Sequence, residues 1–183
     1  MLVLASKSPR RAEILTQAGF EFVVRAADVD EARLDGEAPE VYVKRLAVEK
    51  ARAGPVGAGE IVLGADTVVV VGEEVLGKPR DAGEAARMLR LLSGREHAVI
   101  TGICLRTARR EVGDSVITRV RFAELSEDEI GAYVWSGEPM DKAGAYAIQG
   151  MAGRYVVGID GCYFNVVGLP LSLVYRTLNL ISR

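Results

Sequence analysis

The chain has 183 residues, of which 49% are apolar, so it can bury a sizeable core as one domain or as two closely associated lobes. Its formal net charge of −2 gives no general reason to expect nucleic acid or an anionic membrane as a partner, and no apolar run approaches the roughly 18 residues of a membrane helix. The two cysteines, Cys104 and Cys162, form no CxxC motif, which argues against a zinc site and fits a reducing cytoplasm, and the apolar segment after Met1 is too short for a secretion signal.

The first predicted elements are a short strand and a helix with a basic start. Residues 2–5 are apolar, Ser8 is a favoured N-cap residue, Pro9 suits the first helical position and Gly19 suits the end of the helix. Three cations stand at this helix start, where they oppose the helix dipole: Lys7, Arg10 and Arg11. Their placement favours an anion-binding site, in which N–H and guanidinium groups surround a phosphate, over a capped surface helix with solvated arginines.

A strand predicted at residues 22–24 precedes an acidic loop and a second helix. The loop contains Glu31 among several acidic residues that suit a solvated surface. The helix is predicted to begin at Pro39, and its apolar stripe consists of Val43, Leu46 and Ala47. The next position on this stripe is Lys50, which either extends along the helix to solvent or points into a cleft.

Residues 61–71 form a continuous apolar stretch, rich in β-branched residues, that predicts a strand buried on both faces. Asp66 and Thr67 interrupt this stretch. A carboxylate inside such a strand is costly unless it is paired or bound to a metal. Asp66 is therefore either a structural group that hydrogen-bonds a nearby loop or a catalytic carboxylate held on a rigid strand.

Basic residues follow this strand. Lys78 precedes a proline, which disfavours helix at Lys78 and predicts an extended segment. Asp81 and Glu84 have the spacing of a capping box, so Asp81 is expected to cap a helix, with a role in a site as the alternative. Lys78 and Arg80 are candidates to return positive charge toward Asp66.

The C-terminal half is predicted to contain four strands and two helices. The strands are expected at residues 97–107, 111–122, 155–157 and 163–167, and the first two form a hairpin. Ser126 and Glu129 have the spacing of a capping box for a helix. The last helix is expected to bury Leu171, Val174, Tyr175 and Leu178.

Two polar residues of this half bear on function. His97 is the chain's single histidine, so no His-based triad or His cluster can form, and it is expected to be a strand residue without a special role. Gln149 precedes Gly150 and either reads the edge of a base or satisfies backbone groups in a turn.

The residues by themselves therefore indicate an α/β domain with a cationic helix start and several carboxylates near lysines. Without His or Cys ligands, this combination suits a phosphorylated substrate and an oxygen-ligated metal such as Mg²⁺ or Mn²⁺. Attack of water on a phosphoryl group would use a carboxylate base, a metal and cationic side chains. The pattern does not distinguish hydrolysis from transfer or from binding alone.

Several motifs, in order along the whole chain, resemble those of the Maf family of nucleotide pyrophosphatases. They are residues 4–11 (LASKSPRR), 64–67 (GADT), 77–81 (GKPRD), 92–94 (LSG), 141–150 and 167–171 (VGLPL). The resemblance implies one Maf-type domain over residues 1–183 with the Maf/inosine-triphosphatase-like α/β fold. That fold is a long, mixed, twisted sheet flanked by helices, with two lobes, a central cleft and often a dimeric assembly.

The resemblance also implies hydrolysis of a nucleoside triphosphate to the monophosphate and pyrophosphate with a divalent metal, Mg²⁺ or Mn²⁺. It assigns catalysis to Asp66 as proton acceptor together with Glu31 and Lys78, and it makes Glu31 and Asp66 the metal ligands. The substrate-binding residues it implies are Ser8, Arg10, Arg11, Lys50, Thr67 and Gln149.

Three of these positions separate two branches of the family. The branch that acts on dTTP and UTP carries Arg, Thr and Gln at the positions of Arg10, Thr67 and Gln149, as this sequence does, whereas the 7-methyl-GTP branch carries Trp, Gln and Glu. The resemblance thus predicts removal of excess or modified pyrimidine triphosphates by a cytoplasmic homodimer that binds neither nucleic acid nor membranes. The alternatives are a nucleotide-binding regulator of cell division with incidental hydrolysis and, less in keeping with the charge, a nucleic-acid-binding protein.

Overall fold

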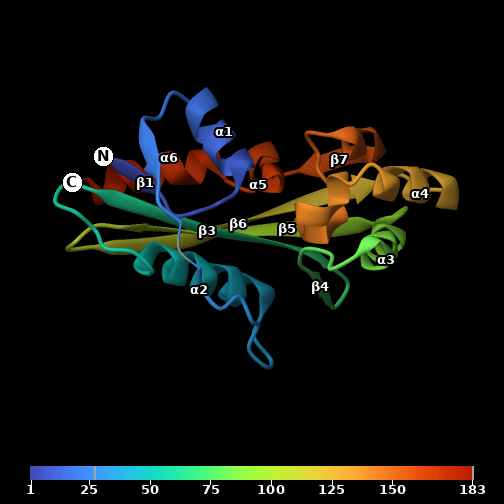
Figure 1. Cartoon of the computed structure of the whole chain (residues 1–183), viewed down its shortest axis with the longest axis horizontal. Helices are drawn as coiled ribbons and strands as arrows, with labels where there is room; N and C mark the ends of the chain where they lie inside the picture. The colour runs from blue at the N-terminus through green and yellow to red at the C-terminus, as the bar shows by residue number, and fades with distance from the viewer. Residues whose placement is uncertain (27, 183) are drawn as a thin grey trace. The chain divides into compact units, whose positions relative to one another are not determined.

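The computed structural model describes residues 1–26 and 28–182, which form a mixed α/β structure (Figure 1). In this part of the chain, seven strands make one sheet in the order β2-β1-β3-β5-β6-β7, and β4 pairs with β3. The strands are β1 (Leu2–Leu4), β2 (Phe22–Val24), β3 (Ile61–Val71), β4 (Glu74–Leu76), β5 (Glu96–Arg106), β6 (Glu111–Phe122) and β7 (Val156–Asp160). Because β1 runs parallel to β2 and β3 while β4 and β7 pair antiparallel with β3 and β6, the predicted mixed sheet is confirmed.

The helices are α1 (Pro9–Gln17), α2 (Pro39–Arg52), α3 (Ala82–Leu92), α4 (Glu127–Trp135), α5 (Tyr163–Val167) and α6 (Leu171–Ile181), with short 3-10 helices at Glu138–Asp141, Ala143–Ala145 and Met151–Tyr155. Helices α1, α2, α3, α4 and α6 begin where the sequence signals predicted. Asp81 caps α3 by accepting the backbone N–H of Glu84 at 2.8 Å, and Ser126 and Glu129 form the predicted capping box of α4. Ser8 occupies the N-cap position of α1, but its side chain makes no capping hydrogen bond.

The strand predicted at residues 163–167 is wrong, because this segment is helix α5. Its aromatic and β-branched residues fit a strand locally. The side-chain amide of Asn165, however, is buried and donates to the Val99 carbonyl at 2.9 Å and to the Thr118 hydroxyl at 3.0 Å. These contacts with distant strands fix a helical turn that local preference does not indicate.

The inward face of α6 also differs from the prediction at Tyr175, which is 58% exposed. Thr177 takes a buried position instead, and its hydroxyl donates to the Leu173 carbonyl of the same helix at 2.8 Å. A buried hydroxyl can be satisfied within the helix in this way, so the apolar periodicity alone missed it.

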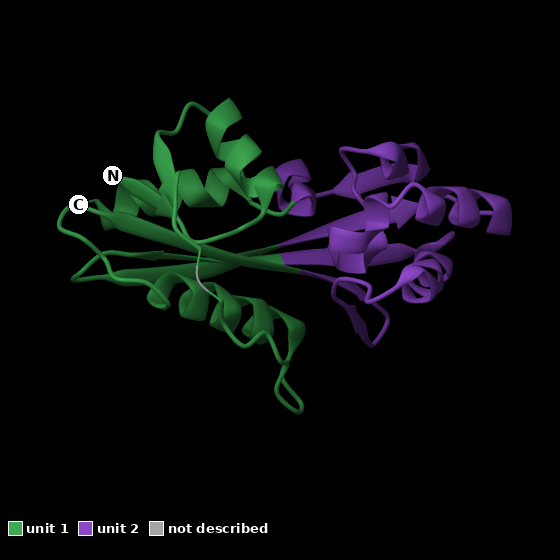
Figure 2. Ribbon diagram, in the orientation of Figure 1, with its two compact units in different colours: residues 1–67, 101–116, 168–183 green, residues 68–100, 117–167 purple. Residues whose placement is uncertain are grey.

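The chain divides into two compact units (Figure 2). Unit 1 comprises residues 1–67, 101–116 and 168–183, and unit 2 comprises residues 68–100 and 117–167. Within unit 1, α2 covers one face of the strands, and α1 and α6 cover the other (Figure 1). Within unit 2, α3 contacts α4, and a core forms around buried aromatic residues that include Phe122, Tyr133, Tyr146 and Tyr155.

Two glycines let α2 lie very close to the strands of unit 1. A Cβ atom at Gly64 would stand 2.1 Å from the Ala47 carbonyl oxygen, and one at Gly102 would stand 2.5 Å from the Val43 carbonyl oxygen. Any larger residue at either position would displace the helix, so these glycines set its distance from the sheet. Among the helices of the described residues, none has both the length and the apolar character needed to cross a membrane.

Candidate active site

The centre of the candidate site is a lysine held between two carboxylates, all within unit 1. Lys50 lies in the last turn of α2, Asp66 lies on β3, and Glu31 lies in the loop before α2. The Lys50 ammonium nitrogen stands 2.6 Å from Asp66 Oδ1 and 2.6 Å from Glu31 Oε1. The side chains of Lys50 and Asp66 are each only 12% exposed, so Lys50 pairs with carboxylates rather than extending to solvent.

The pleat of β3 explains why these groups meet. Gly64 and Asp66 are two residues apart and therefore point to the same face of the sheet, toward α2. Because Gly64 has no side chain, the backbone of α2 approaches this face closely and brings Lys50 onto Asp66. Thr67 points to the opposite face, where it meets Arg11 of α1.

The electrostatics of Asp66 reflect its burial. Burial raises the pKa of Asp66 above its ordinary value, while the charges of Lys50 and Arg11 act in the opposite direction. The cluster therefore keeps a carboxylate in a poorly solvated position with a cation beside it. Such a group can accept a proton or bind a second cation if a substrate or metal changes its surroundings.

The donor set fits a divalent metal that shares its coordination with a substrate. Among residues 1–26 and 28–182, no three Asp, Glu, His or Cys side chains are grouped so as to hold a metal by themselves. Glu31 and Asp66 nevertheless converge on one cationic group. Mg²⁺ typically uses one or two carboxylates, several waters and substrate phosphates, so this pair suits a metal that arrives with a triphosphate.

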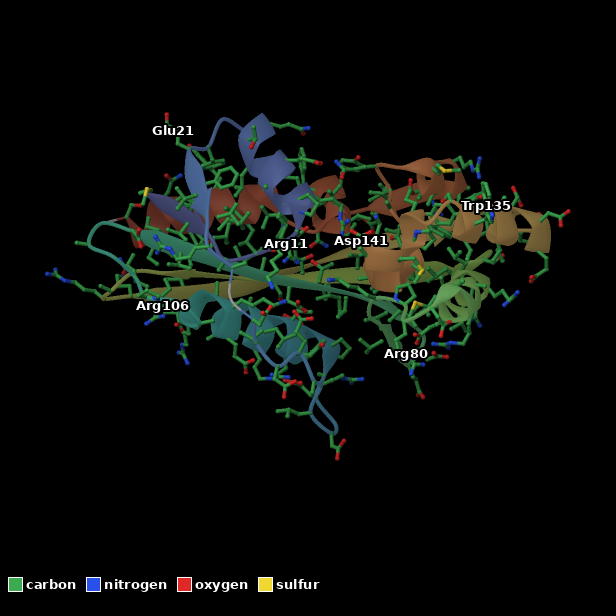
Figure 3. The ribbon with its side chains drawn as sticks, viewed as in Figure 1. Arg11, Glu21, Arg80, Arg106, Trp135 and Asp141 are labelled. Carbon is green, nitrogen blue, oxygen red and sulfur yellow. The ribbon has the colours of Figure 1, made fainter. Side chains whose placement is uncertain are left out.

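Arg11 connects three segments of unit 1. Its Nε donates to the Gly168 carbonyl at 2.8 Å, Nη1 donates to Ser6 Oγ at 3.0 Å and to the Ala65 carbonyl at 2.8 Å, and Nη2 donates to Thr67 Oγ1 at 3.1 Å. The side chain points from α1 to the sheet (Figure 3) and is buried, which lowers the pKa of Arg11. Arg11 thus serves the fold through these bonds, and its predicted contact with a phosphate stays a prediction.

Thr101 is a polar residue of this region that the sequence patterns did not single out. Its hydroxyl lies 2.9 Å from the hydroxyl of Thr67, and the residue is fully buried on β5. The available signal was a lone threonine within the apolar middle of the strand, residues 98–105. Such a residue is usually satisfied by a partner from elsewhere in the fold, and the partner cannot be named from the sequence.

Four other predicted site residues are at least partly exposed. Ser8 and Arg10 lie partly exposed at the start of α1 in unit 1, and Lys78 and Gln149 are exposed residues of unit 2. Their predicted roles in catalysis and substrate binding therefore stay predictions. Arg80 pairs with Glu84 at 2.8 Å.

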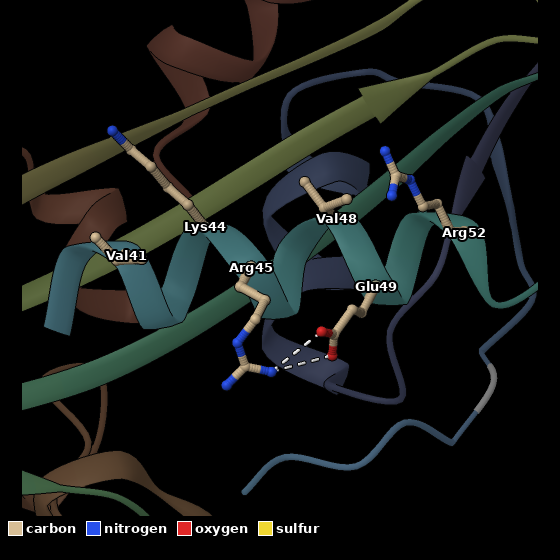
Figure 4. A pocket seen from close by; sticks show the side chains of 6 residues that line it. All are labelled: Val41, Lys44, Arg45, Val48, Glu49 and Arg52. Carbon is tan, nitrogen blue, oxygen red and sulfur yellow. Dashed lines mark hydrogen bonds and ion pairs between the residues drawn. The ribbon is translucent and has the colours of Figure 1, made fainter. Parts of the chain in front are cut away.

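A cavity of about 400 Å³ lies on α2 but contains none of the predicted site residues (Figure 4). Its lining is Val41, Lys44, Arg45, Val48, Glu49 and Arg52. Arg45 pairs with Glu37 at 2.7 Å and with Glu49 at 3.1 Å, and Lys44 pairs with Glu40 at 2.9 Å. Because its cations are already neutralised, this surface is poorly suited to a triphosphate.

The fold is that of an α/β protein, with a mixed sheet and flanking helices. Its candidate site is a lysine between two carboxylates, a charged arrangement of the kind that enzymes acting on phosphates use. The model of the family described as Maf-like protein matches residues 1–181. The chain therefore belongs to the Maf-like protein family, as the motifs indicated.

Curated relatives agree with this assignment. A protein of Anaeromyxobacter dehalogenans named dTTP/UTP pyrophosphatase is 58% identical over 175 residues, which cover 93% of this chain and 89% of that protein. A protein of the same name from Koribacter versatilis is 53% identical and covers 97% of this chain and 92% of its own length. The solved Staphylococcus aureus Ham1 protein aligns with 84% of this chain and 90% of its own at 16% identity and a TM-score of 0.48, so the assignment rests on the family match and the sequence relatives.

Proposed function

We propose that this chain is a nucleoside triphosphate pyrophosphatase that hydrolyses dTTP and UTP to the monophosphate and pyrophosphate. The observation that carries the proposal is the Glu31–Lys50–Asp66 cluster on the α2 face of β3. The substrate class follows from relatives that are 53–58% identical over nearly the whole chain and carry the name dTTP/UTP pyrophosphatase. These names support an enzyme rather than a regulator with incidental hydrolysis.

In the proposed reaction, Asp66 accepts a proton from the attacking water. The new bond forms between the water oxygen and the α-phosphorus, the bond from that phosphorus to the α–β bridging oxygen breaks, and pyrophosphate leaves with the electron pair of the broken bond. Asp66 is suited to this role because it stands on a rigid, buried strand beside an ammonium group. Lys50 limits the charge that builds up between the two carboxylates and the phosphates, and Lys78 is proposed to stabilise negative charge on the substrate.

We propose that Glu31 and Asp66 hold the divalent metal, Mg²⁺ or Mn²⁺, together with substrate phosphates. When bound, the metal neutralises charge on the triphosphate and orients it for in-line attack. The release of Lys50 from one carboxylate would open that carboxylate to the metal, since both share the same ammonium partner.

Base recognition is proposed to involve Arg10, Thr67 and Gln149, which carry the residue types of the dTTP/UTP branch. The amide of Gln149 can donate to and accept from the edge that uracil and thymine share. The 5-methyl group of thymine would change binding by only about 1–3 kcal/mol, so one pocket can serve both bases. Ser8 and Arg11, at the basic start of α1, are proposed to contact the phosphates.

We further propose that the protein acts as a homodimer in the cytoplasm, where it removes excess or modified pyrimidine triphosphates. The two cysteines support a reducing compartment, because both are free and Cys104 is buried.

The proposal is tested by measuring pyrophosphate release from dTTP, UTP and 7-methyl-GTP with Mg²⁺ or Mn²⁺. The wild-type protein should release pyrophosphate from dTTP and UTP and act poorly on 7-methyl-GTP. Asp66→Asn should lower kcat by at least about a hundredfold, because an amide cannot accept the proton. Its circular dichroism should match that of the wild type.

Asp114→Asn is the matched control, since Asp114 is an exposed carboxylate of the same unit that accepts the Ser115 N–H at 2.8 Å and stands 3.9 Å from the Lys44 ammonium nitrogen. Its turnover should equal that of the wild type. Normal turnover in Asp66→Asn would remove Asp66 as the base. Release of orthophosphate, or no product from any nucleotide, would contradict the proposed reaction itself.

A further inference from the structure

Gln149 lies in a tight turn that presents its side chain to solvent. The turn runs from Ala147 to Gly150 and is closed by the Gly150 N–H, which donates to the Ala147 carbonyl at 3.1 Å. Gln149 is exposed, and its amide has no hydrogen-bond partner within residues 1–26 and 28–182. The amide is therefore available to a ligand, whereas the backbone around it is ordered.

Two side chains outside the turn hold it at both ends. The Ala147 N–H donates to the Tyr133 hydroxyl at 3.1 Å, and the Met151 N–H donates to Glu138 Oε2 at 3.1 Å. The Tyr133 hydroxyl in turn donates to Glu138 Oε1 at 2.8 Å. Tyr133 and Glu138 thus form one hydrogen-bonded pair that binds the backbone on either side of Gln149.

The pair is anchored in the core of unit 2. Tyr133 is fully buried on α4 and belongs to the same apolar cluster as Phe122 and Tyr155. Burial, together with the bond to Glu138, raises the pKa of Tyr133, so its hydroxyl stays protonated and able to donate.

The turn is also shaped around the Glu138 carboxylate. A Cβ atom at Gly150 would stand 2.4 Å from both carboxylate oxygens of Glu138. Gly150 therefore leaves the space that the carboxylate needs in order to reach the Met151 N–H. Neither Tyr133 nor Glu138 takes part in the proposed chemistry, so their hydrogen bonds to the backbone of this turn need another explanation.

We propose that Tyr133 and Glu138 are positioning residues that fix the turn of Gln149 and thereby set the preference for uracil and thymine. This inference rests on the proposed function, in which Gln149 reads the base. Along this edge, uracil presents an acceptor at O4 and a donor at N3–H, whereas cytosine presents a donor at its 4-amino group and an acceptor at N3. A fixed turn limits where the amide can be placed, whereas a mobile turn would let it approach either base.

The test compares Tyr133→Phe and Glu138→Gln with the wild type in steady-state pyrophosphate release from UTP, dTTP and CTP. Tyr133→Phe removes the hydroxyl that holds Ala147, and an amide at position 138 has one oxygen for two donors. For both variants, KM for UTP and dTTP should rise about three- to tenfold, with kcat changed by less than about twofold. KM for CTP should change less, so that the preference for UTP over CTP narrows.

Tyr155→Phe is the matched control. Tyr155 is also buried in unit 2, but its hydroxyl accepts from Arg154 at 2.8 Å and donates to the Glu129 carbonyl at 3.4 Å. Its removal should leave all three KM values unchanged. A purely structural loss would lower activity on every nucleotide alike and would not change the preference for UTP over CTP.

A double variant decides whether the pair acts through Gln149. Tyr133→Phe combined with Gln149→Ala should have the same KM for UTP as Gln149→Ala alone, because without the Gln149 amide the turn has no base-reading group to position. Additive effects, or unchanged KM values in both Tyr133→Phe and Glu138→Gln, would overturn the positioning role while wild-type activity upholds the proposed function. A wild-type protein that releases no pyrophosphate would overturn both. If Tyr133→Phe does not fold, Glu138→Gln with Gln149→Ala gives the same comparison.

Discussion

Arg11 is a buried cation whose hydrogen bonds reach three segments that are far apart in the sequence. Its guanidinium group contacts the loop before α1, the strand β3 and the carbonyl of Gly168 before α6. The planar group offers several donors in fixed directions, and an ammonium group cannot reproduce them. This residue therefore contributes to the stability of unit 1 in addition to any contact with substrate.

Arg11→Lys should lower the free energy of unfolding by about 2–4 kcal/mol, because at least two buried acceptors lose their donors. Urea denaturation followed by circular dichroism measures this change. Arg90→Lys serves as control, since Arg90 makes an exposed ion pair with Glu127 at 2.6 Å, and its unfolding curve should hardly move. Equal stability of Arg11→Lys and the wild type would show that the hydrogen bonds of Arg11 add nothing to folding.

His97 is buried, as few histidines are, and its environment predicts a dependence of stability on pH. Its Nε2 lies 2.9 Å from the Tyr146 hydroxyl, its Nδ1 has no partner among the described residues, and burial lowers the pKa of His97 to about 4. Below the ordinary pKa of about 6.5, the unfolded chain gains a proton that the folded protein excludes. Stability contributed by neutral His97 is therefore present above pH 6.5 and lost as the pH falls toward 4.

His97→Gln keeps a neutral hydrogen-bonding group near the position of Nε2 and removes this titration. The wild type should lose up to about 3 kcal/mol more than the variant between pH 6.5 and pH 4, while the difference between them stays constant above pH 7.5. Urea denaturation at a series of pH values measures both. Parallel curves over the whole range would mean that His97 takes up its proton as readily in the folded protein as in the unfolded chain.

At the scale of elements, the contact between α2 and β3 determines where Lys50 lies. The helix backbone lies directly over Gly64, and Asp66 projects from the same face of the strand. A helix shifted outward by even one side-chain layer would withdraw Lys50 from Asp66. Packing of this element and geometry of the site are therefore coupled.

Gly64→Ala should lower the free energy of unfolding by roughly 1–3 kcal/mol and reduce turnover, because its Cβ meets the backbone of α2 and the helix must move. Thermal unfolding and pyrophosphate release measure the two effects. Gly131→Ala is the control: Gly131 lies in α4, and a Cβ atom added there would meet nothing within 4 Å, so alanine should stabilise the helix by about 0.5–1 kcal/mol. A stable and active Gly64→Ala protein would contradict the coupling.

At the scale of the whole molecule, we expect the stability of the fold to be independent of the proposed metal. Lys50 already pairs with both Glu31 and Asp66, so the chain itself supplies a cationic partner for these carboxylates. Folding should therefore not depend on a divalent cation, whereas turnover should.

EDTA is expected to abolish pyrophosphate release, and excess Mg²⁺ or Mn²⁺ should restore it, while the melting temperature without nucleotide stays unchanged. Activity assays and thermal unfolding in the same buffers measure this. Full turnover in EDTA would remove the metal from the proposed mechanism, and a large drop in melting temperature would show that the cation belongs to the fold.

The sequence by itself determined the starts of five of the helices, α1, α2, α3, α4 and α6, together with the buried strand that contains Asp66 and the family. Proline, capping residues and apolar periodicity act over a few neighbouring residues, so Pro9, Pro39, Asp81 and Ser126 could be interpreted without a structure. The family motifs are likewise short and local.

Only the tertiary structure decided that residues 163–167 form a helix, that Tyr175 is exposed, and that Lys50 meets two carboxylates. It also showed the bonds of Arg11 and the pair of Tyr133 and Glu138. Each of these features depends on a partner far away in the chain, and the direction of a side chain is set by the groups packed against it. Local sequence patterns carry no information about which distant groups those are.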